Sequence, residues 1–296
     1  MNIYLFGKTS LSGEAFYELF KLKNIKMNIY PFSRKDKNCY EFNLKEPRSF
    51  SLINNEEFKI ISFAPIWDLS YCLNYLLHKD RKKLKNLTGI IACSSTSALT
   101  KRFESNSFDK NLSSILISSE KNLLKVAKEL KISCQIIRPT MIYGSINGFE
   151  DKNISRILLI MKSLKFILIP SNSGMRQPIH AAQLAEVFFY LISKSNNTKN
   201  KVNCEIINVG GDDIINYAEM IENLKTYKNA QNNVKKCYVI KIPNRLFLIG
   251  ITPIIFFSPK TFAAFSRICA NLSGFKKACE ITKTIPIKFP YSEELK

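Results

Sequence analysis

The 296-residue chain lacks several features that would assign it to a class at once. Its eight cysteines form no Cys-x-x-Cys pair and have no histidine at metal-ligand spacing, so we expect reduced thiols and no metal site. The first residues show neither the basic nor the long apolar region of a secretory leader. The longest apolar run, residues 246–257, contains a proline and is too short to span a bilayer. We therefore expect a cytoplasmic protein without stable membrane insertion.

The charge is strongly one-sided, with 44 Lys and Arg against 24 Asp and Glu and a formal net charge of +20. Binding to nucleic acid would require a focused basic face, but basic runs such as residues 78–85 and 233–237 are short and scattered. We expect a solvated surface and no nucleic-acid partner. A small acidic ligand such as a nucleotide would still be attracted.

Apolar runs alternate with helix-like segments over the first half of the chain. Such alternation predicts βαβ units, and the right-handed crossover rule then gives a doubly wound parallel sheet of the Rossmann type. Strands are expected at 2–6, 26–32, 58–64, 87–95 and 133–139, and helices at 12–22, 66–79 and 118–131.

The pattern is looser in the second half. Residues 154–166 and 181–195 are helix-like, 204–211 resembles a strand, and the proline-rich tail from residue 240 suggests a small irregular lobe. We expect an NAD(P)-binding core at 1–145 and, at 146–296, a part that completes the sheet and forms a small substrate-binding lobe.

The first predicted strand ends in the sequence FGKTSLSG, which places glycines at Gly7 and Gly13 and Ser10 midway between them. A tight strand-to-helix turn needs glycine where the backbone approaches a pyrophosphate, and the helix N-terminus then offers free N–H groups. This turn predicts a dinucleotide site that includes Thr9 and Leu11, although Ser10 replaces the usual middle glycine. Two glycines in such a turn are also compatible with a purely structural role.

The second predicted strand ends in FSRK, where an acidic residue would bind the ribose hydroxyls of NAD. Arg34 at this point favours the 2′-phosphate of NADP. A surface arginine without this role would look the same, so NADP and NAD both remain candidates.

Further motifs resemble the extended and atypical short-chain dehydrogenase/reductases, namely the NAD-dependent epimerase/dehydratase family and its bacterial nucleoside-diphosphate-sugar epimerase-like subgroup. The matching segments follow the family's order over about residues 1–225. They are FGKTSLSG, SFAPIWDL (62–69), ACSSTSALTK (92–101), IIRPTMIYG (136–144), GMRQPIHAAQLAE (174–186) and NVGGDDIINYAEM (208–220).

The resemblance implies roles for individual residues. Pro139, Thr140 and Tyr143 would lie at the nicotinamide end of the cleft, and Arg176 matches an arginine that grips the substrate pyrophosphate. His180 follows in the family's pattern, with Gln183 where an acid is usual. A buried structural histidine is the simpler interpretation of His180.

The expected catalytic pair is missing. Such enzymes use a Tyr-x-x-x-Lys pair in which the lysine and the cofactor lower the tyrosine pKa. Counting back from Arg138 places that pair near Ser113 and Ile117, and no Tyr-x-x-x-Lys occurs between residues 100 and 135. Ser95, which matches the family's substrate-oriented Ser/Thr, is present but has no adjacent base in the sequence.

Three interpretations follow. The first is an NAD(P)-dependent epimerase, dehydratase or reductase that acts on a nucleotide sugar, with Ser95 or Tyr143 standing in for the missing base. The second is a catalytically inactive Rossmann protein that binds NADP(H) as a sensor or assembly subunit; a homodimer is left open in either case. The third docks residues 246–257 on an anionic membrane, but burial of that segment as a helix against the sheet is the simpler expectation.

Overall fold

The computed structural model describes residues 2–23, 27–104, 106–197, 202–227 and 232–291. Its centre is an eight-stranded sheet in the order β16-β13-β6-β5-β4-β1-β2-β3, with every neighbouring pair parallel. The doubly wound parallel sheet predicted from the sequence is confirmed. The strands are β1 (Asn2–Phe6), β2 (Asn28–Ser33), β3 (Tyr40–Glu41), β4 (Phe58–Ser62), β5 (Leu87–Cys93), β6 (Ser133–Pro139), β13 (Cys204–Gly210) and β16 (Lys276–Lys277).

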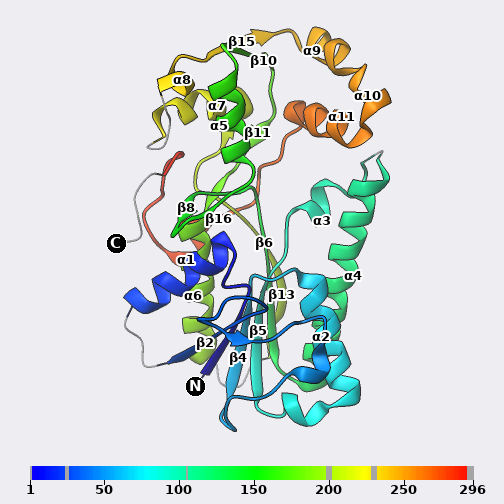
Figure 1. The fold of residues 1–296 in the computed structure, drawn as a ribbon, viewed down its shortest axis with the longest axis vertical. Helices are drawn as coiled ribbons and strands as arrows, with labels where there is room; N and C mark the ends of the chain where they lie inside the picture. The colour runs from blue at the N-terminus through cyan, green and yellow to red at the C-terminus, as the bar shows by residue number, and fades with distance from the viewer. Residues whose placement is uncertain (1, 24–26, 105, 198–201, 228–231, 292–296) are drawn as a thin grey trace.

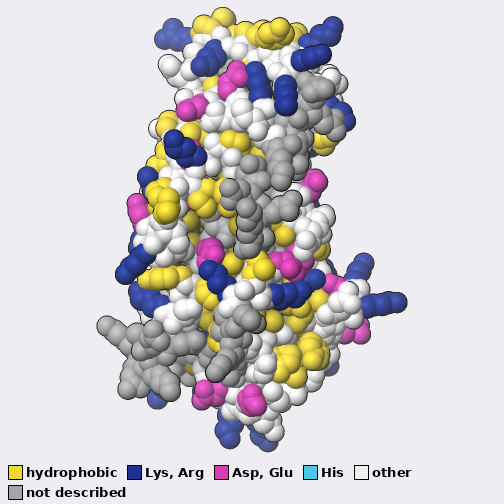
Figure 2. Space-filling model, turned by 90° about the vertical axis from the view of Figure 1, so that its left-hand side faces the viewer, with side chains coloured by type: hydrophobic (Ala, Val, Ile, Leu, Met, Phe, Trp, Pro, Cys, Tyr) yellow, Lys and Arg dark blue, Asp and Glu magenta, His cyan; other side chains and the backbone are white. Residues whose placement is uncertain are grey.

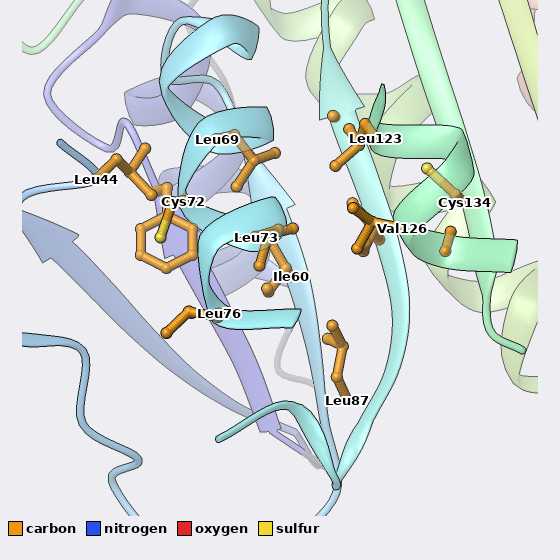
Figure 3. Close-up of a cluster of buried hydrophobic side chains, with 14 of the residues drawn as sticks. Leu44, Ile60, Leu69, Cys72, Leu73, Leu76, Leu87, Leu123, Val126 and Cys134 are labelled. Carbon is orange, nitrogen blue, oxygen red and sulfur yellow. The ribbon is translucent and has the colours of Figure 1, made fainter. Parts of the chain in front are cut away.

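Helices cover both faces of this sheet (Figure 1). On one face lie α1 (Leu11–Leu22), α6 (Ala181–Asn197) and α12 (Ala278–Thr282), and on the other α2 (Ile66–Lys79) and α4 (Ser107–Leu130). The central strands are apolar on both sides because each side chain, whichever way it points, meets a helix. Figure 3 shows the cluster beneath α2 and α4, where Leu73, Ile60 and Val126 point toward one another.

Helix α4 begins eleven residues before the predicted start at residue 118. The N-cap Asn106 accepts a hydrogen bond from the backbone N–H of Asp109 at 2.8 Å and so fixes the helix start. The first turns are rich in Ser and Asn, which weakens the apolar periodicity on which the prediction depended.

The second half of the chain returns twice to the sheet layer, through α6, β13, β16 and α12. Its other elements form a lobe at one end of the molecule (Figure 1). The lobe elements are α5 (Ile154–Ser163), β10 (Phe166–Pro170), β11 (Met175–Arg176), β14 (Ile215–Asn216), α7 (Tyr217–Asn223), α8 (Asn232–Lys235), β15 (Tyr238–Ile242), α9 (Asn244–Ile251), α10 (Ile254–Phe257), α11 (Pro259–Ser266) and the 3-10 helix η4 (Arg267–Cys269).

Short pieces connect the sheet layer to the lobe. Helix α3 (Ser97–Thr100) follows β5. Strand β7 (Ile142–Tyr143) pairs with β12 (Ile179–His180), and β8 (Ser145–Ile146) forms a hairpin with β9 (Phe149–Glu150).

The apolar segment 246–257 does not lie buried against the sheet, so the simpler expectation for it was wrong. It forms the end of α9 and all of α10 at the tip of the lobe, where only Phe247 and Ile251 are buried. No helix within the described residues has the length and apolarity needed to cross a membrane.

Candidate cofactor and substrate site

The turn after β1 brings two backbone segments into close contact at the point where the strand order reverses. β1 pairs with β2 on one side and with β4 on the other. Gly7 has φ +78°, and a Cβ on it would lie 2.4 Å from the Ala64 backbone nitrogen that follows β4. Glycine is therefore required at position 7 for both conformation and space. In open α/β sheets, ligands bind at this kind of reversal point.

Ser10 can replace the middle glycine because its side chain forms hydrogen bonds within the turn. Its hydroxyl donates to the Gly7 carbonyl at 2.8 Å and accepts the Gly13 N–H at 3.1 Å, which makes it the N-cap of α1. Gly13 packs so closely that a Cβ would lie 2.1 Å from the Gly7 oxygen. The backbone at this end of the helix thus stays accessible, with Leu11 and Ser12 supplying the first N–H groups of α1 beside the cleft.

A cavity of about 550 Å³ adjoins this turn. Gly7, Thr9 and Ser10 lie on one side of it and Arg34 with Lys35 on the other, next to several phenylalanines. The nearby Asp36 does not offer a free carboxylate. It accepts the Asn38 N–H at 3.0 Å, the main reason for its lowered pKa, and lies 3.6 Å from Lys8.

A larger cleft of about 1390 Å³ continues from this cavity between the sheet and the lobe. The two share Ser10 and the segment 63–65. The sequence-predicted residues that line the larger cleft are Ser10, Leu11, Ser95, Pro139, Thr140 and Arg176.

Ser95, Pro139 and Thr140 meet because β5 and β6 are neighbours whose carboxyl ends lie at the same edge. The Ser95 hydroxyl accepts the Ser97 N–H at 3.1 Å, and the Thr140 hydroxyl donates to the Gln177 carbonyl. The Ser95 and Thr140 hydroxyls thus stabilise the loops after β5 and β6, and both residues line the cleft.

A buried ion pair that sequence reasoning missed fixes the same edge. Arg138 at the end of β6 donates through Nε to Glu120 of α4 at 2.8 Å, and a second guanidinium nitrogen contacts the other carboxylate oxygen. Ser94, next to Ser95, also donates to Glu120. Such a planar, two-point contact holds the strand end and the helix in one geometry.

The structure brings no tyrosine to the place of the missing catalytic pair. Ser113 is buried, and its hydroxyl donates to the Ala98 carbonyl at 2.7 Å. Among the described residues that line the cleft, Tyr217 of α7 is the one tyrosine. Burial raises its pKa, so its hydroxyl stays protonated near neutral pH.

Tyr143 and His180 lie together, but outside the set of cleft-lining residues. They are register partners in the β7–β12 pair, and their rings are 5.0 Å apart. The Tyr143 hydroxyl accepts the Tyr291 N–H at 2.9 Å, and burial raises the Tyr143 pKa. Burial lowers the pKa of His180 to about 4, so its ring is neutral near pH 7, and its Nδ1 accepts the Ala182 N–H. This arrangement favours the structural interpretation of His180.

Gln183, at the family's usual acid position, is explained by a carboxylate beside it. Its amide nitrogen donates to Asp212 at 2.8 Å, and its oxygen accepts the His180 N–H at 3.0 Å. Asp212 also accepts the backbone N–H groups of Cys279 and Ile287. An acid at position 183 would face a second buried carboxylate, whereas an amide supplies the donor that Asp212 needs.

Arg176 reaches the cleft but donates to the lobe. One terminal nitrogen contacts the Met175 and Ala270 carbonyls at 2.8 and 2.6 Å, and the other contacts the Arg267 carbonyl. Its guanidinium carbon lies 5.1 Å from the centre of the Tyr217 ring. Arg176 thus carries a buried positive charge at the cleft wall while holding η4 in place.

A charge network closes the side of the cleft between α4 and the lobe. Asp109, fully buried, contacts Lys101 at 2.6 Å and Arg267 at 2.8 Å, and Arg267 also contacts Glu104 at 2.9 Å. The pKa of Asp109 falls to about 2: burial alone would raise it, but the hydrogen bonds from Lys101, Asn106 and Arg267 outweigh that effect. Sequence reasoning missed this network because Arg267, which joins the two carboxylates, is 158 residues from Asp109 in the chain.

No protein-family model matches the sequence, and no curated protein matches it. Solved structures do share the fold. The human epimerase family protein SDR39U1, solved with NADPH, is 12% identical with a TM-score of 0.65, and the match covers 98% of this chain and 96% of that one. A nucleoside-diphosphate-sugar epimerase from Staphylococcus aureus is 11% identical with a TM-score of 0.62, covering 97% and 98% of the two chains.

A third neighbour, MoeE5 in complex with UDP-glucose and NAD, is 11% identical with a TM-score of 0.62 and covers 98% of this chain and 95% of its own. At these identities the likeness establishes the fold. The chain has the Rossmann-type architecture of NAD(P)-dependent epimerases and short-chain dehydrogenase/reductases, and the resemblance inferred from the motifs is confirmed at that level.

Proposed function

We propose that the protein binds NADP(H) along the glycine turn and takes a nucleotide sugar in the adjoining cleft, as an epimerase, dehydratase or reductase. The observation that carries the proposal is the turn itself. Gly7 and Gly13 leave no room for a Cβ, and Ser10 keeps its side chain out of the pyrophosphate position. Gly7, Thr9, Ser10, Leu11 and Gly13 would hold the pyrophosphate.

Arg34 supports NADP over NAD. It lines the cavity beside the turn with Lys35, while the neighbouring Asp36 is engaged by Asn38 and Lys8. A guanidinium at this position suits a 2′-phosphate, which carries two negative charges. Solved neighbours are complexed with NADPH, as SDR39U1 is, or with NAD, as MoeE5 is, which supports a nicotinamide cofactor of either form.

The larger cleft would hold the second ligand. Pro139 and Thr140 would lie beside the nicotinamide, Ser95 would hydrogen-bond a sugar hydroxyl, and the cationic wall formed by Arg176, Lys152 and Arg156 would attract a diphosphate. When bound, the nicotinamide supplies hydride transfer. Tyr217, beside Arg176, would donate a proton in this cleft, whereas Tyr143, which we had considered as a substitute for the missing base, does not line it.

A second candidate is a Rossmann protein that holds NADP(H) without chemistry. Ser113 favours it, because the serine stands near the usual tyrosine position and its hydroxyl is engaged by the Ala98 carbonyl. A serine without an adjacent base does not deprotonate a sugar hydroxyl near neutral pH.

The cofactor proposal is tested by titrating NADPH and NADH into the protein and following nicotinamide fluorescence. Arg34→Glu should weaken NADPH binding by about tenfold or more through loss of a charge-assisted contact, with NADH affected far less. Lys37→Glu makes the same charge change on an exposed residue that does not line the cavity, and should leave both affinities nearly unchanged. If both variants lost NADPH affinity equally, Arg34 would not be the residue that binds the 2′-phosphate.

Chemistry is tested separately by adding UDP- and dTDP-sugars to protein loaded with NADP⁺. A transient rise in reduced nicotinamide absorbance, or an epimerised product, supports the enzyme. Stabilisation by NADPH with no response to any sugar nucleotide leaves the second candidate.

A further inference from the structure

The far end of the C-terminal lobe carries a small sheet that is apolar on both faces. Strands β10 and β15 pair in parallel, and their inward side chains Ile167, Ile169 and Val239 pack in the lobe core. A sheet face in contact with water usually carries polar side chains. Here the outward residues are Phe166, Leu168, Tyr238 and Ile240, which are 54%, 47%, 73% and 44% exposed.

Helices α9 and α10 extend this exposed apolar surface. Asn244 at the start of α9 exchanges hydrogen bonds with Asn172, just after β10, so the helix begins beside the sheet. We call the combined surface the apolar end. It consists of the four outward sheet residues together with Leu246 (58% exposed), Ile249 (67%), Phe256 (85%) and Phe257 (89%). A gathering of large exposed apolar side chains of this kind marks an interaction site.

The charges around the apolar end are mostly positive, although helix α7, which packs against β15, carries Glu219 and Glu222, and Glu222 pairs with Lys225 at 2.7 Å. Basic residues occur throughout the sequence, but residues 152–185 and 223–279, which supply β10, β15 and α9 to α11, contain no Asp or Glu. The exposed charged residues flanking the apolar end include Lys162, Lys165, Lys241, Arg245 and Lys260. Figure 2 keeps the lobe uppermost and shows hydrophobic side chains at this end, with Lys and Arg side chains and some Asp or Glu side chains around them.

We propose that the apolar end docks on the surface of an anionic lipid bilayer. Aromatic and aliphatic side chains would enter the headgroup boundary while the surrounding lysines contact lipid phosphates. The choice of occupant rests on charge complementarity, because exposed apolar side chains flanked by Lys and Arg match an anionic headgroup layer above hydrocarbon. The contact is peripheral: side chains enter the interface and no helix crosses the bilayer.

The experiment is vesicle flotation of the full chain. Vesicles containing about one third phosphatidylglycerol in phosphatidylcholine should carry the protein to the top of the gradient, whereas pure phosphatidylcholine should carry far less. Binding should weaken as salt is added, because the lysine contribution is screened. Absence of flotation with the anionic vesicles at low salt overturns the proposal.

Variants distinguish vesicle binding through the apolar end from nonspecific binding through other exposed apolar residues. Phe256→Ser with Phe257→Ser should lower vesicle binding by roughly tenfold or more, and Lys165→Glu with Lys241→Glu should act through charge in the same direction. Ile285→Ser is the matched control: Ile285 is 85% exposed, as Phe256 is, but lies in the C-terminal segment outside the apolar end. A cooperative thermal unfolding transition without added ligand shows that each variant is folded.

The vesicle binding of the variants, compared with that of the wild type, decides whether the apolar end contacts lipid. Loss in the two double variants with normal binding by the Ile285 variant upholds the proposal. Equal binding by all variants overturns it. A third outcome would identify a second copy of this chain as the occupant. In that case sedimentation would show a wild-type dimer and a monomeric Phe256→Ser, Phe257→Ser variant, and neither protein would bind vesicles. The lipid proposal would then fail.

Discussion

The polar groups of the glycine turn after β1 and those of the Tyr143–His180 junction, where β7 pairs with β12, lie in opposite environments. At the turn, close backbone packing excludes side chains and leaves the start of α1 beside a cavity. At the junction, the Tyr143 hydroxyl accepts the Tyr291 N–H and the His180 ring accepts the Ala182 N–H. Gln183 accepts the backbone N–H of His180 and donates to Asp212. The comparison teaches that two polar motifs of one fold can end in opposite environments: one leaves backbone N–H groups beside a cavity, and the other buries its polar side chains in internal hydrogen bonds.

The largest effect is expected at the turn, and two glycines with nearly equal φ provide a controlled test. Gly7→Ala puts a methyl group 2.4 Å from the Ala64 nitrogen at φ +78°, and should cost about 2–5 kcal/mol of unfolding free energy together with cofactor binding. Gly148→Ala at φ +80° meets nothing within 4 Å and should cost only about 1 kcal/mol. Urea unfolding and NADPH titration measure both; equal losses would show that strain, not close packing, governs position 7.

At the junction, Gln183→Glu tests whether the amide is required by Asp212. The new carboxylate would replace a donor 2.8 Å from a buried carboxylate, so we expect a loss of about 3 kcal/mol at neutral pH. A loss of this size corresponds to a pKa of the introduced acid raised by about two units, so the loss should begin to shrink below about pH 6.5 and be nearly gone near pH 4, where the protonated acid can donate to Asp212. Chemical unfolding at pH 7 and at lower pH measures this; a loss independent of pH would contradict the explanation.

The Asp109 network gives the next effect, and its sign follows from the lowered pKa. The folded-state pKa of about 2 lies below the ordinary 3.8, so the ionised form contributes about 2 kcal/mol above about pH 4, and this is lost as pH falls toward about 2. Asp109→Asn should therefore be destabilised at pH 7 and differ less from wild type in acid. Asp80→Asn removes an exposed ion pair with Lys83 and should change stability by less than about 1 kcal/mol.

The smallest effect distinguishes two tyrosines. Tyr143→Phe loses the contact with the Tyr291 N–H and should cost about 1 kcal/mol of stability without changing ligand binding. Tyr217→Phe alters a cleft-lining residue and should weaken nucleotide-sugar binding with little change in stability. Thermal unfolding with and without ligand measures both, and the reverse pattern would return Tyr143 to the catalytic role.

Much of the fold was predictable from local pattern. Strands β1 and β6 and helix α2 have the predicted bounds because their apolar periodicity is strong, whereas the start of α4 depends on the Asn106 cap within a polar stretch. The predicted residues that line the cleft follow strand ends, as Ser95, Pro139 and Thr140 do, or stand in a quoted motif, as Arg176 does. Tyr217 lies within the segment 208–220 but was not singled out there, Arg267 carried no motif, and both reach the cleft through the packing of the lobe.

The sequence by itself determined the parallel sheet, the glycine turn and the absence of the Tyr-x-x-x-Lys pair, because each is a matter of local spacing. Only the tertiary structure decided that Ser10 folds into its own turn, that Tyr143 and His180 are buried, and that residues 246–257 lie at an exposed tip. The physical reason is that a side chain's burial and hydrogen-bond partners are set by residues distant in the chain, such as Tyr291 for Tyr143 and Asp212 for Gln183.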